Sequence, residues 1–191
     1  MTSNSSPTIS TNDTSSDESQ SGKPHRLVAV VDVDGTLVDS LPRLRAFSVF
    51  RTQIAGGRGL WNQEQVDEFL GLANADADLP FPGAVEGVKY ILHSGLFEPV
   101  VLTGRTELAR THTRHLLIKK FGIPSSVPMF MRAADDSRVT EECKPDMFVK
   151  QVLPRYEGPF VFFEDESRTL SEFAKHGLAL KAPECWQAMI V

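Results

Sequence analysis

From residue 27 onward, short apolar runs alternate with amphipathic stretches along this 191-residue chain. The apolar runs are continuous and lie at 27–31, 99–102, 127–131, 159–163 and 178–180, as expected for strands buried on both faces. The stretches between them have the spacing of helices and lie at 84–94, 105–120, 144–153 and 166–176. Strands that alternate with helices form right-handed crossovers. The sequence therefore predicts an α/β fold with a doubly wound, Rossmann-like parallel sheet.

Two segments differ from this pattern. Of the first 22 residues, 12 are Ser or Thr, and such a segment buries too little apolar surface to fold, so we predict a disordered tail over 1–24. Residues 38–80 follow the first strand and carry two helical segments, at 41–54 and 62–73. We predict a small cap-like insertion over the carboxyl ends of the strands, where such folds bind ligands. The folded domain is expected to span 25–191.

Composition excludes several classes of protein. No apolar run approaches the roughly 20 residues that span a bilayer, and the N-terminus lacks the pattern of a signal peptide. Two cysteines, Cys143 and Cys185, form no disulfide framework. The chain has 20 Lys and Arg against 25 Asp and Glu, a net charge of −5, which argues against coating nucleic acid or anionic membrane. We expect a cytoplasmic protein with no membrane partner.

The first strand ends in two carboxylates, Asp32 and Asp34, followed by Gly35. Side chains two residues apart on a strand point the same way, and the repulsion between these two is costly without a cation or a shared proton. The pair suits a carboxylate nucleophile beside a general acid/base, with a divalent ion holding both. The alternative is an acidic turn after a buried strand.

Three other predicted strands are also followed by polar groups. Thr103 and Gly104 begin the next predicted helix, where a hydroxyl and N-terminal amides would seat a phosphate. Lys144 is expected to begin a later helix, and Glu164 and Asp165 end the fourth strand with hard oxygen ligands that suit Mg²⁺. Each group also has an ordinary explanation, as a helix cap or a surface lysine. Together they predict one polar site at one edge of the sheet.

With these four motifs in this order, the sequence resembles the haloacid dehalogenase superfamily of phosphohydrolases. The resemblance implies that Asp32 attacks phosphorus and forms an aspartyl-phosphate. It implies that Asp34 protonates the leaving oxygen and then activates water. It also implies that phosphate oxygens are held by Thr103, Gly104 and Lys144.

The same resemblance implies a Mg²⁺ cofactor. The metal would be held by Asp32, Asp165 and the backbone carbonyl of Asp34, with Glu164 assisting. The family often has Asp-Asp or Gly-Asp at this last motif, so the pair Glu164-Asp165 is a departure from it.

A narrower resemblance concerns the substrate. The segments 131–138 and 184–187 are similar to the 3′-phosphatase half of phage-type polynucleotide kinase-phosphatases. This similarity implies that arginines near the pocket contact the substrate, namely Arg43, Arg105, Arg132 and Arg138. The predicted helix 105–120 adds basic charge, with five Lys or Arg against Glu107 alone. The insertion 38–80 is a departure from that group, and the sequence contains no P-loop motif of a kinase domain.

These residues predict a Mg²⁺-dependent phosphomonoesterase that acts on nucleotide-type phosphates, such as the 3′-phosphate ends of DNA or RNA. The alternatives are a phosphatase of mononucleotides or small metabolites gated by the insertion, a phosphomutase, and an inactive binding module. The expected partner is a phosphorylated small molecule or a nucleic-acid end.

Overall fold

The computed structural model describes residues 26–46, Glu64 and residues 77–188. The predicted tail over 1–24 and most of the predicted helices 41–54 and 62–73 lie outside the described residues. Among the described helices, none is both long and apolar enough to cross a membrane.

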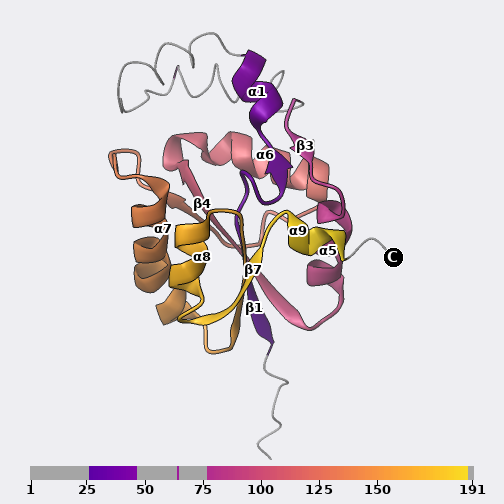
Figure 1. Cartoon of the computed structure of the whole chain (residues 1–191), viewed down its shortest axis with the longest axis vertical. Helices are drawn as coiled ribbons and strands as arrows, with labels where there is room; N and C mark the ends of the chain where they lie inside the picture. The colour runs from indigo at the N-terminus through magenta and orange to yellow at the C-terminus, as the bar shows by residue number, and fades with distance from the viewer. Residues whose placement is uncertain (1–25, 47–63, 65–76, 189–191) are drawn as a thin grey trace, which may run out of the picture.

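A parallel sheet of five strands forms the centre of the molecule (Figure 1), in the order β5-β4-β1-β6-β7. The strands are β1 (Leu27–Val31), β4 (Phe97–Thr106), β5 (Met129–Arg132), β6 (Phe160–Glu164) and β7 (Gly177–Lys181). The chain winds outward from β1 to β4 and β5, and then returns to the other side of β1 for β6 and β7. This order confirms the doubly wound α/β fold, and its switch point lies at the carboxyl end of β1, where such sheets bind ligands.

Helices cover both faces of the sheet. One face carries α5 (Ala84–His93), α6 (Arg110–Phe121) and α9 (Glu184–Gln187), and the other carries α7 (Thr140–Met147) and α8 (Ser167–Phe173). A 3₁₀ turn, η1 (Glu107–Ala109), precedes α6, and a π-helical turn, η2 (Phe148–Val152), followed by a 3₁₀ turn, η3 (Leu153–Arg155), continues α7. The central strand therefore packs into two cores.

The alternation of side chains in β1 shows how these two cores are built. Ala29 and Val31 belong to the core under α5, α6 and α9, whereas Val28 and Val30 belong to the core under α7 and α8. All four side chains are buried. This burial on both faces is the reason that the strand sequence is continuously apolar.

The insertion leaves and rejoins the domain through a short stem. β2 (Val38–Asp39) pairs antiparallel with β3 (Leu79–Pro80), and α1 (Leu41–Ala46) follows β2 directly. The backbone N–H of Gly35 donates to the carbonyl of Val38 at 2.9 Å. The stem therefore stands beside the carboxyl end of β1, above the sheet in the view of Figure 1.

Two predicted helix starts are wrong. The strand predicted at 99–102 continues to Thr106, because its pairing with β5 resumes there after a shift in register, so the helix does not begin at 105. The helix that contains Lys144 begins at Thr140 rather than at Lys144. Its first turn closes earlier because the N–H groups of Glu142 and Cys143 both donate to the carbonyl of Val139 at 3.1 Å.

Candidate active site

Three carboxylates meet at the carboxyl edge of the sheet. Asp32 follows β1, Glu164 is the last residue of β6 and Asp165 follows it, and the two strand ends are adjacent because Val31 is in register with Phe163. One oxygen from each of the three lies within 4.8 Å of the others. Because carboxylate oxygens are the ligands that Mg²⁺ prefers, this donor set fits a divalent cation. The predicted grouping of these three residues is found in the structure.

Lys144 neutralises part of this cluster. Its Nζ lies 3.0 Å from Oδ1 of Asp32 and 2.7 Å from Oε2 of Glu164, and its side chain is only 2% exposed. Burial by itself lowers the pKa of an ammonium group, but the two carboxylates raise the pKa of Lys144 above its ordinary value. Burial raises the pKa of both Asp32 and Glu164, and Lys144 opposes that rise. The lysine thus favours the ionised form of both acids.

Asp34 is held by two arginines instead of by the lysine. Arg105 donates from Nε and Nη2 to the two carboxylate oxygens, each at 2.6 Å, and Nη2 of Arg43 donates at 3.3 Å. Burial alone would raise the pKa of Asp34, but Arg105 first and then Arg43 lower it below its ordinary value. Asp34 is therefore a carboxylate in this structure, with its side chain 36% exposed.

Sequence reasoning missed Asp78, which completes this network. Oδ1 of Asp78 accepts from Nε of Arg43 at 2.8 Å, and Oδ2 accepts from Nη2 of Arg105 at 3.4 Å. Its side chain is buried, and its carbonyl accepts from Nζ of Lys120 at 2.8 Å. Asp78 directly precedes β3, so the β3 side of the insertion stem contacts both arginines that hold Asp34, and α1 on the β2 side carries one of them, Arg43. A single Asp in a polar stretch gives no local signal for such a role.

Thr103 and Gly104 lie inside β4, not at a helix N-terminus. The hydroxyl of Thr103 accepts from the backbone N–H of Arg105 at 3.3 Å, and the side chain is buried. A Cβ atom on Gly104 would lie 2.7 Å from the Thr140 methyl at the start of α7. The predicted phosphate site made of amides at a helix N-terminus is therefore wrong, although both residues still lie near the carboxyl edge of the sheet. Glycine at 104 allows α7 to pack against β4.

The structure does not join Arg132 and Arg138 to the Asp34 network. Nη1 of Arg132 donates to the carbonyl of Arg138 at 2.8 Å. Arg138 pairs with Asp136 at 2.7 Å and with Asp146 at 3.2 Å, and its side chain is 43% exposed. These partners lie in the loop after β5 and on α7. The predicted substrate contacts of these two arginines remain predictions.

The basic residues of α6 are also engaged within the fold. Arg110 pairs with Glu107 and donates to the carbonyl of Met129 at 3.2 Å. Arg114 donates to the carbonyl of Val127 at 3.0 Å. Lys120 holds the stem, as described above. The charge of this helix therefore anchors the start of β5 and the insertion, a role that the count of charges did not predict.

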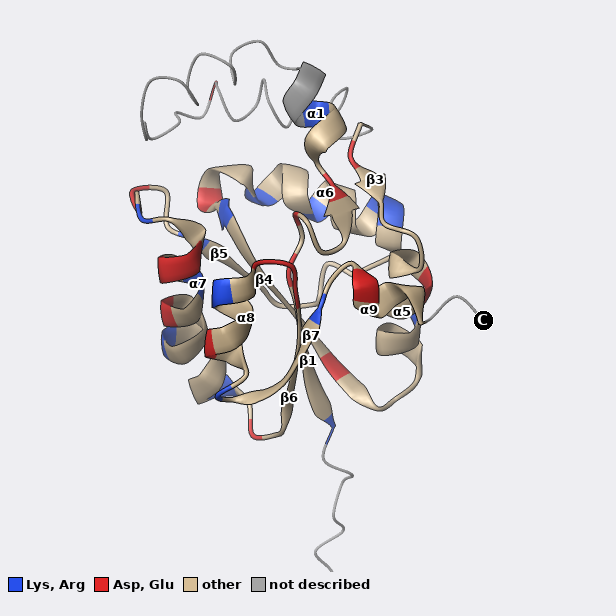
Figure 2. Ribbon diagram, in the orientation of Figure 1, with Lys and Arg blue, Asp and Glu red and all other residues tan. Residues whose placement is uncertain are grey.

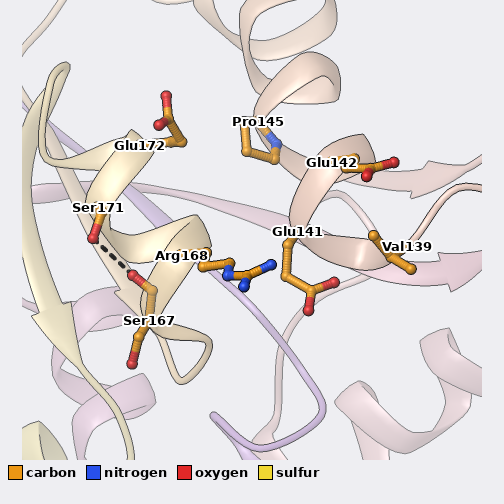
Figure 3. A pocket seen from close by; sticks show the side chains of 8 residues that line it. All are labelled: Val139, Glu141, Glu142, Pro145, Ser167, Arg168, Ser171 and Glu172. Carbon is orange, nitrogen blue, oxygen red and sulfur yellow. Dashed lines mark hydrogen bonds between the residues drawn. The ribbon is translucent and has the colours of Figure 1, made fainter.

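A hollow of about 640 Å³ opens between the starts of α7 and α8. Figure 3 shows Arg168 and Glu141 pointing toward each other across it, with Glu142 and Glu172 on its walls. Ser167, which also lines it, is two residues from Asp165. Figure 2 shows acidic segments along this edge, in the loop after β6 and at the start of α7. Glu166 caps the N-terminus of α8, since its carboxylate accepts from the Thr169 N–H at 2.6 Å.

Comparison with known proteins reports similarity of structure only. No family model matches the sequence, and no curated protein matches it. A chain of the solved Pnkp1/Rnl/Hen1 complex is 19% identical with a TM-score of 0.54, and the match covers 90% of this chain and 50% of that one. A second solved structure, of the Pnkp1/Rnl/Hen1 RNA repair complex, is 19% identical with a TM-score of 0.55, covering 89% and 45%. The predicted resemblance is confirmed at the level of the fold.

This chain thus spans about half the length of those two solved chains. A haloacid dehalogenase-like hydrolase from Streptococcus pneumoniae is also similar, at 13% identity and a TM-score of 0.48, with 86% of this chain and 91% of that one covered. At these identities the comparisons describe a shared architecture.

Proposed function

We propose that this protein is a Mg²⁺-dependent phosphomonoesterase that works through an aspartyl-phosphate on Asp32. The observation that carries the proposal is the buried group formed by Asp32, Glu164, Asp165 and Lys144 at the switch point of the sheet. Four buried or half-buried charges in one place are costly for folding. A catalytic role explains their retention.

Asp32 is the proposed nucleophile. Its carboxylate oxygen forms a bond to phosphorus while the bond from phosphorus to the leaving oxygen breaks, and Asp34 gives that oxygen its proton. Water then attacks the phosphorus of the aspartyl-phosphate and gives one proton back to Asp34. Inorganic phosphate leaves, and Asp32 is restored.

The arginine network supports the part of Asp34 in this cycle. Arg105 and Arg43 keep Asp34 ionised while no anion is present. A phosphate beside Asp34 would compete for the same guanidinium groups, and its negative charge would raise the pKa of Asp34 toward the protonated form that an acid needs. Both arginines are therefore proposed to bind substrate phosphate, with Thr103, Gly104 and Lys144 nearby.

Mg²⁺ would be held by Asp32, Asp165 and the carbonyl of Asp34, with Glu164 beside them, and would neutralise charge on the phosphoryl oxygens. Glu164 has a second role in the structure, since its Oε1 accepts from the backbone N–H of Glu166 at 3.1 Å while Oε2 accepts from Lys144. These contacts fix the strand end that carries Asp165.

The preferred substrate is a nucleotide-type phosphate, such as the 3′-phosphate end of DNA or RNA. The two solved chains with the highest TM-scores reported above come from Pnkp1/Rnl/Hen1 complexes, one described as an RNA repair complex. A second candidate substrate is a mononucleotide or small phosphorylated metabolite. Two observations favour it: Arg110, Arg114 and Lys120 of α6 donate to backbone carbonyls, and the groove between α7 and α8 is lined by three glutamates and one arginine.

The activity is tested with para-nitrophenyl phosphate and purified full-length protein. We expect phosphate release that requires Mg²⁺ and is lost in Asp32→Asn. Release that is equal in wild type and Asp32→Asn would remove Asp32 as nucleophile, and no release from either would favour a binding module.

The substrate class is tested with one panel at equal concentrations. It contains 3′-phosphorylated and 5′-phosphorylated oligonucleotides, mononucleotides and sugar phosphates. The highest kcat/KM on 3′-phosphorylated oligonucleotides supports the end-processing proposal. A higher kcat/KM on sugar phosphates or on free nucleotides would replace it with the small-substrate candidate.

A further inference from the structure

The indole of Trp186 is bonded to the turn that follows the nucleophile. Trp186 lies on α9 and is completely buried, and its Nε1–H donates to the carbonyl oxygen of Thr36 at 2.8 Å. The two residues are 150 positions apart in the chain. A hydrogen bond from the C-terminal helix therefore holds the backbone of the turn that contains Asp34, Gly35 and Thr36.

The ring of Trp186 is itself fixed from two directions. It stacks on the ring of Phe163, with centroids 4.7 Å apart and an angle of 9° between the planes. A Cβ atom on Gly87 of α5 would lie 2.5 Å from ring atom Cε3, so the glycine lets the helix approach the ring closely. Phe163 directly precedes Glu164 and Asp165 in β6. The indole thus contacts the strand end that carries two of the three carboxylates.

The other side of the same turn faces Asp165. The hydroxyl of Thr36 donates to Oδ1 of Asp165 at 3.4 Å. Gly35 has a φ of +78°, and a Cβ there would lie 2.2 Å from Oδ2 of Asp165. The turn therefore has little room to move toward Asp165, and Trp186 restrains it from moving away.

We propose that Trp186 is a positioning residue that sets the affinity of the carboxylate cluster for a divalent cation. It acts through Thr36, by fixing the turn after Asp32 relative to Asp165. This inference rests on the proposed function. Outer partners that orient metal ligands are typically worth about 10–100-fold in metal affinity, and one neutral hydrogen bond acting through the backbone belongs at the lower end of that range.

Trp186→Phe tests this directly, because phenylalanine keeps a ring on Phe163 but has no N–H to donate. We expect the dissociation constant for Mg²⁺, measured by calorimetric titration of the full chain, to rise about 10-fold. The kcat for para-nitrophenyl phosphate at saturating Mg²⁺ should fall by less than the Mg²⁺ affinity does, because Arg43 and Arg105 still hold the carboxylate of Asp34. Val88→Ala is the matched control, since Val88 is buried in the same core and its truncation removes methyl groups but no hydrogen-bond donor.

The outcomes separate the two proposals. If wild type binds Mg²⁺ and hydrolyses phosphomonoesters while Trp186→Phe keeps wild-type Mg²⁺ affinity, the positioning inference is overturned and the function stands. An equal loss of affinity in Val88→Ala would also overturn it, because general loosening of the core would then explain the change. If wild type neither binds Mg²⁺ nor hydrolyses phosphomonoesters, the function itself fails.

A second measurement needs no change at Trp186. The chain has two tryptophans, so in a ¹⁵N-labelled Trp61→Phe variant the remaining indole N–H resonance belongs to Trp186. We expect Mg²⁺ to shift this resonance with the same dissociation constant as in calorimetry, since coupling between two sites is reciprocal. A resonance that does not move at saturating Mg²⁺ would overturn the inference even if Trp186→Phe does not fold.

Discussion

Replacing Lys144 by methionine removes the cation that, among the described residues, forms ion pairs with both Asp32 and Glu164. At 3.0 and 2.7 Å, each attraction is on the order of 5–6 kcal/mol at an effective dielectric of about 20. The lysine's own desolvation cost disappears with it, so the net loss is smaller. Breaking a buried ion pair by removing one partner typically costs about 3–5 kcal/mol, because a buried charge is left uncompensated.

We therefore expect Lys144→Met to lower the free energy of unfolding by about 3–5 kcal/mol at pH 8. For a domain of this size, each kcal/mol lowers Tm by about 2–4 °C, so Tm should fall by about 6–20 °C. Thermal unfolding followed by circular dichroism in buffer with EDTA measures this. Lys150→Met is the matched control, since the exposed pair of Lys150 with Asp146 is worth about 0–1 kcal/mol.

The loss of unfolding free energy in Lys144→Met should also depend on pH and should be larger at higher pH. Burial raises the pKa of Asp32 and Glu164, and without Lys144 both values should rise further. Acids whose pKa is raised in the folded state contribute stability below their unfolded pKa of about 4, and lose it as the pH rises through the folded value. The deficit of Lys144→Met should therefore be small near pH 5 and large at pH 8. A Tm within 2 °C (about 1 kcal/mol) of wild type at pH 8, or a deficit that is the same at both pH values, would refute this reasoning.

Three further predictions follow from the described contacts. Asp34→Asn should slow turnover of para-nitrophenyl phosphate by about 10²–10⁴-fold as a general acid/base, and near-normal turnover would remove Asp34 from that role. Asp78→Asn should lower kcat/KM by on the order of 100-fold, because Arg43 and Arg105 lose the carboxylate that they share and their guanidinium groups shift by up to about 1 Å. An unchanged kcat/KM would show that the stem does not position these two arginines. Burial raises the pKa of Cys185 to about 11, so at pH 8 its thiol should react with a disulfide reagent about 100-fold more slowly in the folded protein than in urea. Equal rates would contradict that shift.

The fold was predictable because its signal is local. Each central strand carries a continuous apolar run, which can be recognised in the sequence without knowing which strands lie next to it. Helix starts were less predictable, since the first turn of α7 depends on Val139 and on packing of Thr140 against Gly104. The end of β4 depends likewise on its pairing with β5, which resumes at Thr106.

The carboxylate cluster was predictable for a different reason. Parallel strands place their carboxyl ends at one edge of the sheet, so acids at the carboxyl ends of β1 and β6 meet because those strands pair. Lys144 was expected near them, although its place within α7 was not. Arg132 and Arg138 show the limit of the same reasoning, because their partners in the structure are a carbonyl and two carboxylates of nearby segments.

The amino-acid sequence alone was therefore enough to predict the doubly wound sheet and the edge at which Asp32, Glu164 and Asp165 meet. Apolar runs and strand ends depend on residues that are adjacent in the chain. Which cation faces which acid depends on contacts between distant segments of the chain. Asp78 reaches Arg43 and Arg105 because the insertion stem closes beside β1, and Trp186 reaches Thr36 because α9 returns to that strand end. Such contacts join residues that are far apart in the chain. The partner of each polar group is therefore determined by burial and geometry in the folded protein and not by the local sequence pattern.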